Sequence, residues 1–166
     1  MPNDVFRASD AVLVLAVDDK STPEGAVADA LVTQFGFANS VGRLKGVSVA
    51  VSSDVQPFYE IGRRYPTHLR GGNVRTSGSI SRAHINGALL RLLLGDGATS
   101  PPASPNFVQP SFNIIATLQD SAHPDQNVKV IVFGVKFSSW STTIPLDDFV
   151  MESVNFEALR VAYEAT

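Results

Sequence analysis

The chain contains no cysteine, which excludes disulfide bonds, thiol catalysis and thiolate metal sites. Charged residues are also scarce, because they make up 17% of the 166 residues against roughly 25% in an average soluble domain. The apolar fraction is an ordinary 44%, and this balance argues against intrinsic disorder. The length is typical of one domain, and the low charge indicates that much of the surface does not face bulk water.

Other familiar signals are missing as well. No run of about 18 apolar residues offers a transmembrane helix, and the opening segment MPNDVFRASD lacks the basic and apolar regions of a secretory signal. HExxH, GxSxG, GxxxxGK[ST] and GxGxxG are all absent, and His68, His84 and His123 show no metal-ligand spacing. The sequence therefore predicts no enzyme, no cofactor, no metal site and no membrane insertion.

Charge is unevenly distributed along the chain, although the net charge is only −3. Both ends are acidic, and the second acidic end includes Asp147 and Asp148. Residues 61–95 contain no acid and six arginines, which are Arg63, Arg64, Arg70, Arg75, Arg82 and Arg91. Two interpretations remain open. The charges are solvated faces that pair within one subunit, or they form complementary surfaces between copies of the chain.

Apolar and alternating segments predict an antiparallel β protein. The predicted strands are Val12–Val17, Arg43–Val51, Asn73–Arg82, Ser111–Gln119 and Val128–Ser138, with Pro57–Ile61 as a possible addition. Polar or glycine-rich stretches at Ser52–Asp54 and Gly71–Asn73 are expected to break strands, and Gly134 is expected to mark a bulge. For Asp148–Tyr163 we favour two strands broken near Ser153 to Asn155 over a helix.

One helix is predicted clearly, at about residues 82–94, with Ser81 as its N-cap and Gly95 as its stop. It is apolar around most of its circumference, so Leu89 and Leu92 are expected at an inter-subunit surface. Ser21–Glu24 is a helix-start signal for a short helix that ends near Gly36, with a long loop as the alternative.

The fold class that follows is mainly β (α+β): two packed antiparallel sheets forming a sandwich or barrel, with one flanking helix. Residues 1–166 are expected to form a single domain with extended loops at about 18–42, 53–72 and 95–110. The strand 73–82 places Ser77 and Ser79 on a face of small hydrophilic residues, which must meet water or a polar channel.

The segment Phe58–Gly95 (FYEIGRRYPTHLRGGNVRTSGSISRAHINGALLRLLLG) resembles the core of bacteriophage tail tube proteins of the contractile-tail kind. It has the same order of a strand, a turn-rich arginine segment, a small-polar strand and an amphipathic helix. The ending, from Asp148 to Tyr163, resembles the final strands of that family. The tubes of type VI secretion systems and contractile bacteriocins are similar, and the sequence does not separate them.

The resemblance implies a structural virion protein of the viral tail. Six copies would form a ring whose inner wall is a continuous barrel, and stacked rings would conduct DNA during ejection. The implied partners are other copies of the chain and the tail sheath, baseplate and terminator proteins, with assembly in the host cytoplasm. We expect the arginines above, with Asp147 and Asp148, to lie between subunits, and Ser77, Ser79 and Glu152 to face the lumen, where acids dominate.

Two alternatives stay open. The chain is a tail terminator, a connector or a secretion-system tube protein, or, in another class, a β-barrel that binds a small ligand.

Overall fold

A computed structural model describes residues 6, 11–39, 41–42, 44–83, 87–101, 108–120 and 122–165. Seven strands dominate it, so the prediction of a mainly β (α+β) fold is confirmed. The strands are β1 (Ala11–Ala16), β2 (Leu44–Phe58), β3 (His68–Ala83), β4 (Phe112–Gln119), β5 (Asn127–Thr143), β6 (Met151–Ala158) and β7 (Arg160–Ala165). The helices are α1 (Pro23–Phe35), α2 (Ala88–Leu94) and the 3-10 turn η2 (Gly95–Ala98).

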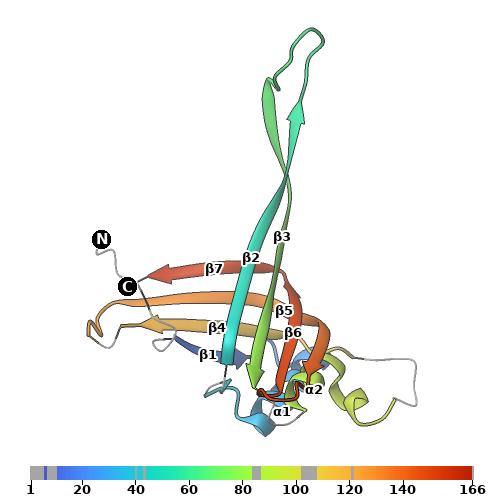
Figure 1. Cartoon of the computed structure of the whole chain (residues 1–166), viewed down its shortest axis with the longest axis vertical. Coiled ribbons are helices and arrows are strands. Elements are labelled where there is room, and N and C mark those ends of the chain that lie inside the picture. The colour runs from blue at the N-terminus through green and yellow to red at the C-terminus, as the bar shows by residue number, and fades with distance from the viewer. Residues whose placement is uncertain are drawn as a thin grey trace.

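Every strand pair is antiparallel, in the order β1-β4-β5-β6-β3-β2, and β7 pairs with β5. The first part of β5, up to Val135, lies between β4 and β7, and the last part, Lys136–Thr143, pairs with β6. The two expected sheets are thus two parts of one curled sheet joined through β5. We call them the crosswise part (β1, β4, early β5, β7) and the axial part (late β5, β6, β3, β2), after their directions in Figure 1.

A β-bulge at Gly134 lies where β5 passes from one part to the other, as the sequence predicts. Phe112 pairs with Val135 but Ile114 with Val132, so β5 has one extra residue here. Gly134 has a φ of +63°, and a Cβ added to it would lie 2.5 Å from a side-chain atom of Leu159. Only glycine fits both the backbone and the space, so this residue allows the sheet to bend.

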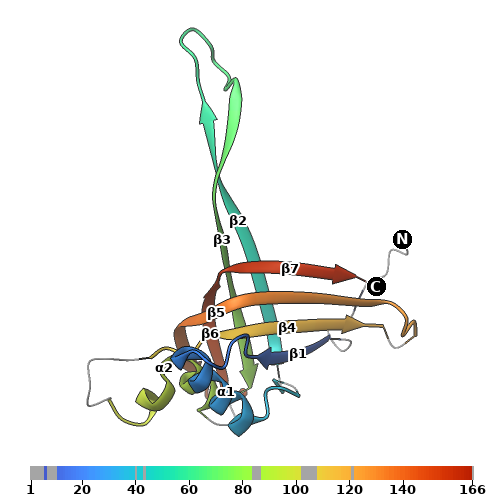
Figure 2. The same ribbon diagram turned by 180° about the vertical axis from the view of Figure 1, so that it is seen from behind.

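The β2–β3 hairpin extends far beyond the rest of the molecule along its long axis (Figures 1 and 2). The expected loop at 53–72 is therefore shortened to 59–67, because β2 continues to Phe58 and β3 begins at His68. The two predicted breaks lie opposite each other in the ladder, where the register shifts between Ser53 and Val55. A Cβ on Gly72 would lie 2.4 Å from the Asp54 carbonyl oxygen, so the glycine permits a bulge rather than a turn.

One of the two helices matches the prediction and the other is shorter than expected. The short helix before Gly36 is confirmed as α1, and the Thr22 hydroxyl accepts a hydrogen bond from Gly25 N at 3.1 Å. The loop at 18–42 is corrected accordingly. The flanking helix is shorter than 82–94, because β3 continues to Ala83 and α2 begins at Ala88. Pairing with β6 overrides the helical pattern there, so Ser81 is a strand residue and not an N-cap.

The strand pair at the end of the chain is confirmed, but its break lies at Leu159 rather than near Ser153 to Asn155. The third expected loop, 95–110, begins with η2, and its residues 102–107 lie outside the described residues. The core lies between the curled sheet and the two helices. Its largest buried side chains include Phe112, Phe137 and Phe156. The Phe137 ring contacts the rings of both other residues.

Candidate assembly surface

The axial part of the sheet has one face on which a row of small polar side chains crosses the strands, and the ion-paired Arg75 and Glu157 lie on the same face. Cross-strand pairing aligns Ser48 with Ser79, Ser79 with Asn155, and Asn155 with Ser139, so one polar row crosses all four strands. Within it, the hydroxyls of Ser48 and Ser79 are 2.9 Å apart, and Asn155 Nδ2 donates to Ser139 Oγ at 2.8 Å. Ser77 shares the face because it lies two residues from Ser79.

The opposite face is buried where β3 and β6 pair. Ile80 on β3 and Val154 on β6 are paired, and both are at most 1% exposed. This contrast between the faces arises from strand alternation, since successive side chains point to opposite sides. The strand 73–82 thus has the polar face that its sequence predicts.

Glu152 lies on the buried face and is only 1% exposed, so its expected place in a lumen is wrong. Its Oε1 accepts a hydrogen bond from Arg82 Nε at 2.8 Å, and its Oε2 accepts one from Trp140 Nε1 at 3.1 Å. The Arg82 guanidinium also lies 5.7 Å from the centroid of the Phe37 ring. Arg82 is 3% exposed, so it is a core residue and not an inter-subunit one.

Sequence alternation contains the signal for this buried pair. Glu152 has the same parity as the buried Val154 and Phe156, and Arg82 has the parity of Ile80. The expectation that Leu89 and Leu92 lie at an inter-subunit surface is also wrong. Both have no exposed surface in the single chain, so their partners belong to the same subunit.

The other predicted charges divide into three groups. Arg75 forms an ion pair with Glu157 of the same chain, which supports the interpretation of pairing within one subunit. Arg91 is half-buried on α2. The exposed remainder lies at two sites: Arg63, Arg64 and Arg70 near the tip of the hairpin, and Asp147 and Asp148 between β5 and β6.

Two strand edges of the axial part are unpaired within the described residues. β2 pairs only with β3, and Lys136–Thr143 of β5 pairs with β6 on one side alone. An apolar groove of about 670 Å³ runs beside the β2 edge. Val47, Val49 and Val51 line it from β2, and Val130 and Tyr163 line it from the crosswise part. The three valines are 40%, 36% and 56% exposed, so the groove is an open apolar surface.

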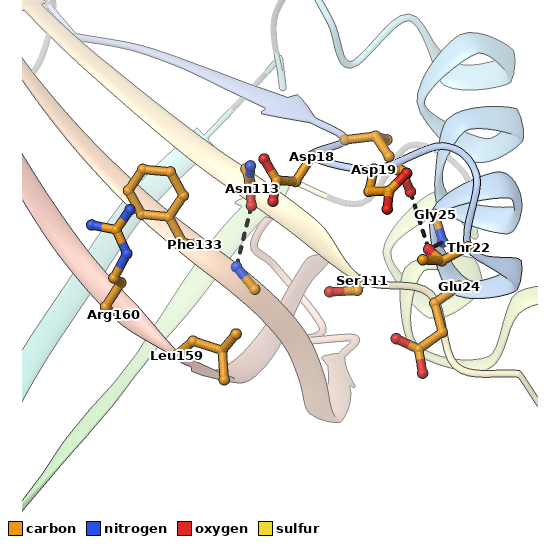
Figure 3. Close-up of a pocket in the computed structure, with 12 residues that line it drawn as sticks. Asp18, Asp19, Thr22, Glu24, Gly25, Ser111, Asn113, Phe133, Leu159 and Arg160 are labelled. Atoms are coloured by element: carbon orange, nitrogen blue, oxygen red, sulfur yellow. Dashed lines mark hydrogen bonds between the residues drawn. The ribbon is translucent and has the colours of Figure 1, made fainter.

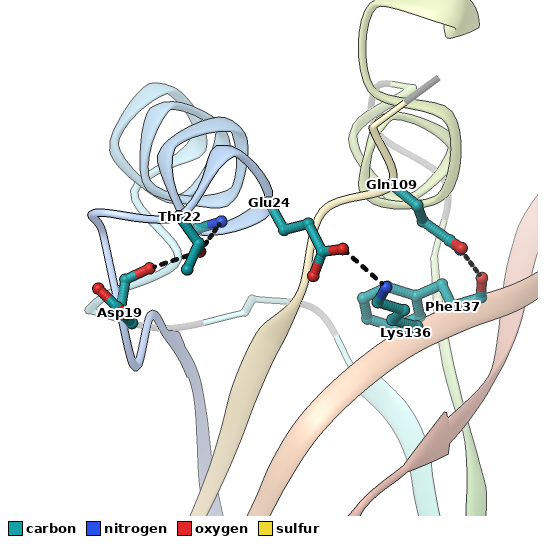
Figure 4. A network of polar contacts seen from close by, with 7 residues as sticks. Asp19, Thr22, Glu24, Gln109, Lys136 and Phe137 are labelled. Carbon is teal, nitrogen blue, oxygen red and sulfur yellow. Dashed lines mark hydrogen bonds and ion pairs between the residues drawn. The ribbon is translucent and has the colours of Figure 1, made fainter. Parts of the chain in front are cut away.

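A smaller pocket of about 310 Å³ lies between α1 and the bend of β5 (Figure 3). Three acids line it, but two of them have partners in the chain. Glu24 Oε1 accepts from Lys136 Nζ at 3.2 Å (Figure 4). The Asp19 carboxylate accepts hydrogen bonds from the hydroxyl and the backbone N–H of Ser21, and these hydrogen bonds lower the pKa of Asp19. The pocket therefore contains contacts that position α1 against the sheet.

Within the described residues, no group of three or more histidine, aspartate or glutamate side chains is arranged to hold a metal ion. None of the described helices is long and apolar enough to span a bilayer.

Comparison with family models and with curated sequences finds no match for this chain. Solved structures do match. A sheath/tube terminator of an extracellular contractile injection system (PVC), in the extended state, has a TM-score of 0.64 at 12% identity, over 99% of each chain. The SPP1 tail tube has a TM-score of 0.57 at 10% identity, over 98% of this chain and 80% of that one.

A third similar structure is the tail of the empty GTA particle, refined with C6 symmetry. Its TM-score is 0.56 at 13% identity, over 98% of this chain and 99% of that one. The chain therefore has the fold of tail tube and tube terminator proteins, and the resemblance predicted from Phe58–Gly95 is confirmed at the level of fold.

Proposed function

We propose that the chain is a structural tail tube subunit that closes into hexameric rings, which stack around a lumen that conducts DNA. The observation that carries this proposal is the axial part of the sheet, which combines two edges without a partner strand among the described residues with one face rich in small polar side chains. Unpaired edges expose backbone donors and acceptors, and a closed barrel of several copies removes them.

Strand direction is compatible with such closure. The axial part has four strands in antiparallel alternation, late β5, β6, β3 and β2. Because four is even, β2 of one copy is antiparallel to the late β5 of a copy placed beside it in the same orientation. In a ring closed in this way, the strand pairs between copies are antiparallel, like the strand pairs within each copy.

The apolar groove supports the same arrangement. It lies beside the β2 edge, so a copy that pairs with this edge also covers Val47, Val49 and Val51. Covering apolar surface contributes roughly 25 cal/mol per Å². The low charge of the chain, 17%, suits a subunit whose surface is shared with its neighbours.

In the proposed ring the polar face that contains Ser77, Ser79 and Asn155 lines the lumen. A lumen that conducts DNA must not bind the DNA tightly, because each phosphate that a cation neutralises adds affinity. The hydroxyls and amides of this face meet the requirement, and its two charged residues, Arg75 and Glu157, form an ion pair with each other. This corrects the expectation of an acid-dominated lumen, since Glu152 is buried and Glu157 is paired with Arg75.

Sixfold symmetry is supported by the similar GTA tail, and the similar PVC structure contains a sheath as well as a tube. We therefore place the chain in a virion tail, with sheath, baseplate and terminator proteins as partners, and we assign it no enzymatic role. A tube terminator is the second candidate, because the PVC sheath/tube terminator matches this chain from end to end.

Electron microscopy and size-exclusion chromatography of the purified chain test the proposal. Sixfold rings that polymerise into long tubes are expected of a tube subunit. Single rings that bind a preformed tube end without polymerising would favour the terminator. A monomer that persists at high concentration in every salt would contradict both. The edge variant Val49→Asp, which places a charge in the groove, should block ring closure while the chain stays folded.

A further inference from the structure

We propose that Trp140 of one copy inserts into the apolar groove beside the β2 edge of the neighbouring copy, as the anchor of the contact between them. This inference rests on the proposed function and deepens it, because it names the side chain that fills the groove. The partner at the groove is thus a second copy of this chain.

One apolar row crosses the axial part from edge to edge, on the face opposite to the polar one, which we call the apolar face. Pairing aligns Trp140 of β5 with Val154 of β6, Val154 with Ile80 of β3, and Ile80 with Val47 of β2. The two middle residues are at most 1% exposed, whereas Val47 is 40% exposed and Trp140 is half-buried. The row therefore ends in uncovered apolar surface at both edges that lack a partner strand among the described residues.

The two ends of this row differ in shape. The β2 end is hollow, because the groove of about 670 Å³ lies between the β2 valines and the crosswise part. The β5 end carries one large side chain, Trp140, and the rest of Ser138–Thr143 consists of serine and threonine. A single bulky apolar group at one edge thus corresponds to an open apolar groove at the other.

Edge pairing between copies would bring the two ends together on the same side of the sheet. Trp140 lies on the apolar face because it pairs with the buried Val154. Val47 lies there because it pairs with the buried Ile80, and the other two groove valines of β2 follow by strand alternation. In every register that keeps the polar face continuous from copy to copy, the indole meets the groove.

The indole is held in place within its own chain. Trp140 Nε1 donates a hydrogen bond to Glu152 Oε2 at 3.1 Å, and Glu152 Oε1 accepts one from Arg82 Nε at 2.8 Å. Glu152 and Arg82 are 1% and 3% exposed, so the acceptor of the indole is fixed inside the core. A side chain that is already ordered loses little conformational freedom on binding, and its N–H needs no partner in the groove. Tryptophan is also enriched among the residues that dominate binding energy at interfaces.

An anchor on one edge and a groove on the other make a heterologous contact, which generates a ring when the rotation between copies closes. Every copy of a closed ring then inserts its Trp140 once and has its groove filled once. An incomplete ring leaves one groove and one indole uncovered, so the contact favours closure.

Contact quenching tests the insertion directly, because Trp140 is the only tryptophan and the chain has no cysteine. Wild-type copies are mixed with copies that carry Trp140→Phe and a nitroxide label on Tyr163→Cys, in the wall of the groove that faces β2. In mixed rings the nitroxide should quench the emission of the neighbour's Trp140. The matched control carries the label on Lys129→Cys, which is adjacent to the groove residue Val130 but on the opposite, exposed face of the crosswise part, and should quench far less.

Shortening the anchor provides a second test. Trp140→Ala should raise the protein concentration needed for half-maximal ring formation by about tenfold or more, because alanine leaves the groove empty. Trp140→Phe, which keeps an aromatic ring, should recover part of this loss. Ser141→Ala, at the next position of the same strand but on the polar face, should assemble like the wild type. Circular dichroism of each variant checks that the chain is folded.

The outcomes separate the anchor from the proposed function. Equal Trp140 emission in mixed rings with either label position, or Trp140→Ala rings that form at the wild-type concentration, would overturn the anchor and leave the ring intact. Absence of rings in the unmodified chain would remove the proposed function and the anchor together. If Trp140→Ala does not fold, the quenching experiment decides, because its emitting copies are wild-type.

Discussion

Replacing Glu152 with glutamine is the sharpest test of the buried network beneath the polar face. The substitution keeps the side-chain shape and an acceptor for Trp140, but it leaves the Arg82 cation in the core, where Arg82 is 3% exposed. Removing one partner of a buried ion pair costs about 3–5 kcal/mol. In a domain of this size each kcal/mol lowers Tm by about 2–4 °C, so the expected loss is about 6–20 °C.

Urea and thermal unfolding, followed by the fluorescence of the single tryptophan, Trp140, measure this loss. Glu157→Gln on the same strand is the matched control. Its ion pair with Arg75 is exposed, with side chains 69% and 54% accessible, so it should cost less than about 1 kcal/mol. All variants are compared in the same oligomeric state, checked by size-exclusion chromatography, because assembly itself stabilises the folded chain.

The double variant Arg82→Met/Glu152→Gln distinguishes the cause of the loss. If an uncompensated buried charge is responsible, removing the cation as well should recover more than half of the lost stability. A double variant as unstable as Glu152→Gln alone would refute this reasoning. So would a single variant whose stability equals that of the Glu157→Gln control.

Three further predictions concern the edge, the polar face and α1. Val49→Asp should shift the chain to monomer in size-exclusion chromatography with an unchanged circular dichroism spectrum, whereas Lys129→Asp, on an exposed outer position, should leave assembly intact. Ser79→Arg should make assembled tubes retain DNA at low salt and release it as salt rises, and tubes without retention would contradict a DNA-facing position. Thr22→Ala removes the N-cap of α1 and should cost about 1 kcal/mol in urea unfolding, and an unchanged midpoint would refute the cap.

Strand alternation carried most of the fold prediction, because it depends only on nearby residues. It placed Ser77 and Ser79 on a polar face, and a glycine inside a strand separately predicted the bulge at Gly134; both features are present. The long hairpin was missed because its two polar stretches resemble breaks when each is considered alone. Only the register shows that they lie opposite each other, where Gly72 accommodates the Asp54 carbonyl.

The buried ion pair was missed for a related reason. Arg82 and Glu152 are 70 residues apart in sequence, and a charged side chain without a known partner is placed on the surface by default. Parity alone puts each of them on the apolar face, but the cost of burial argues against that choice until the partner is known. Cross-strand pairing of β3 with β6 supplies the partner.

The position of this pair has a consequence for the polar face above it. Arg82 and Glu152 are directly opposite each other in the β3–β6 ladder, so a slip of β6 by one residue would separate the charges and move Glu152 to the polar side. The same slip would bring Asn155 to the apolar side. The buried ion pair therefore penalises a rearrangement that would add a charge to the polar face. A loss of register in Glu152→Gln would be detected as new exposure of Trp140, which pairs with Val154 of β6.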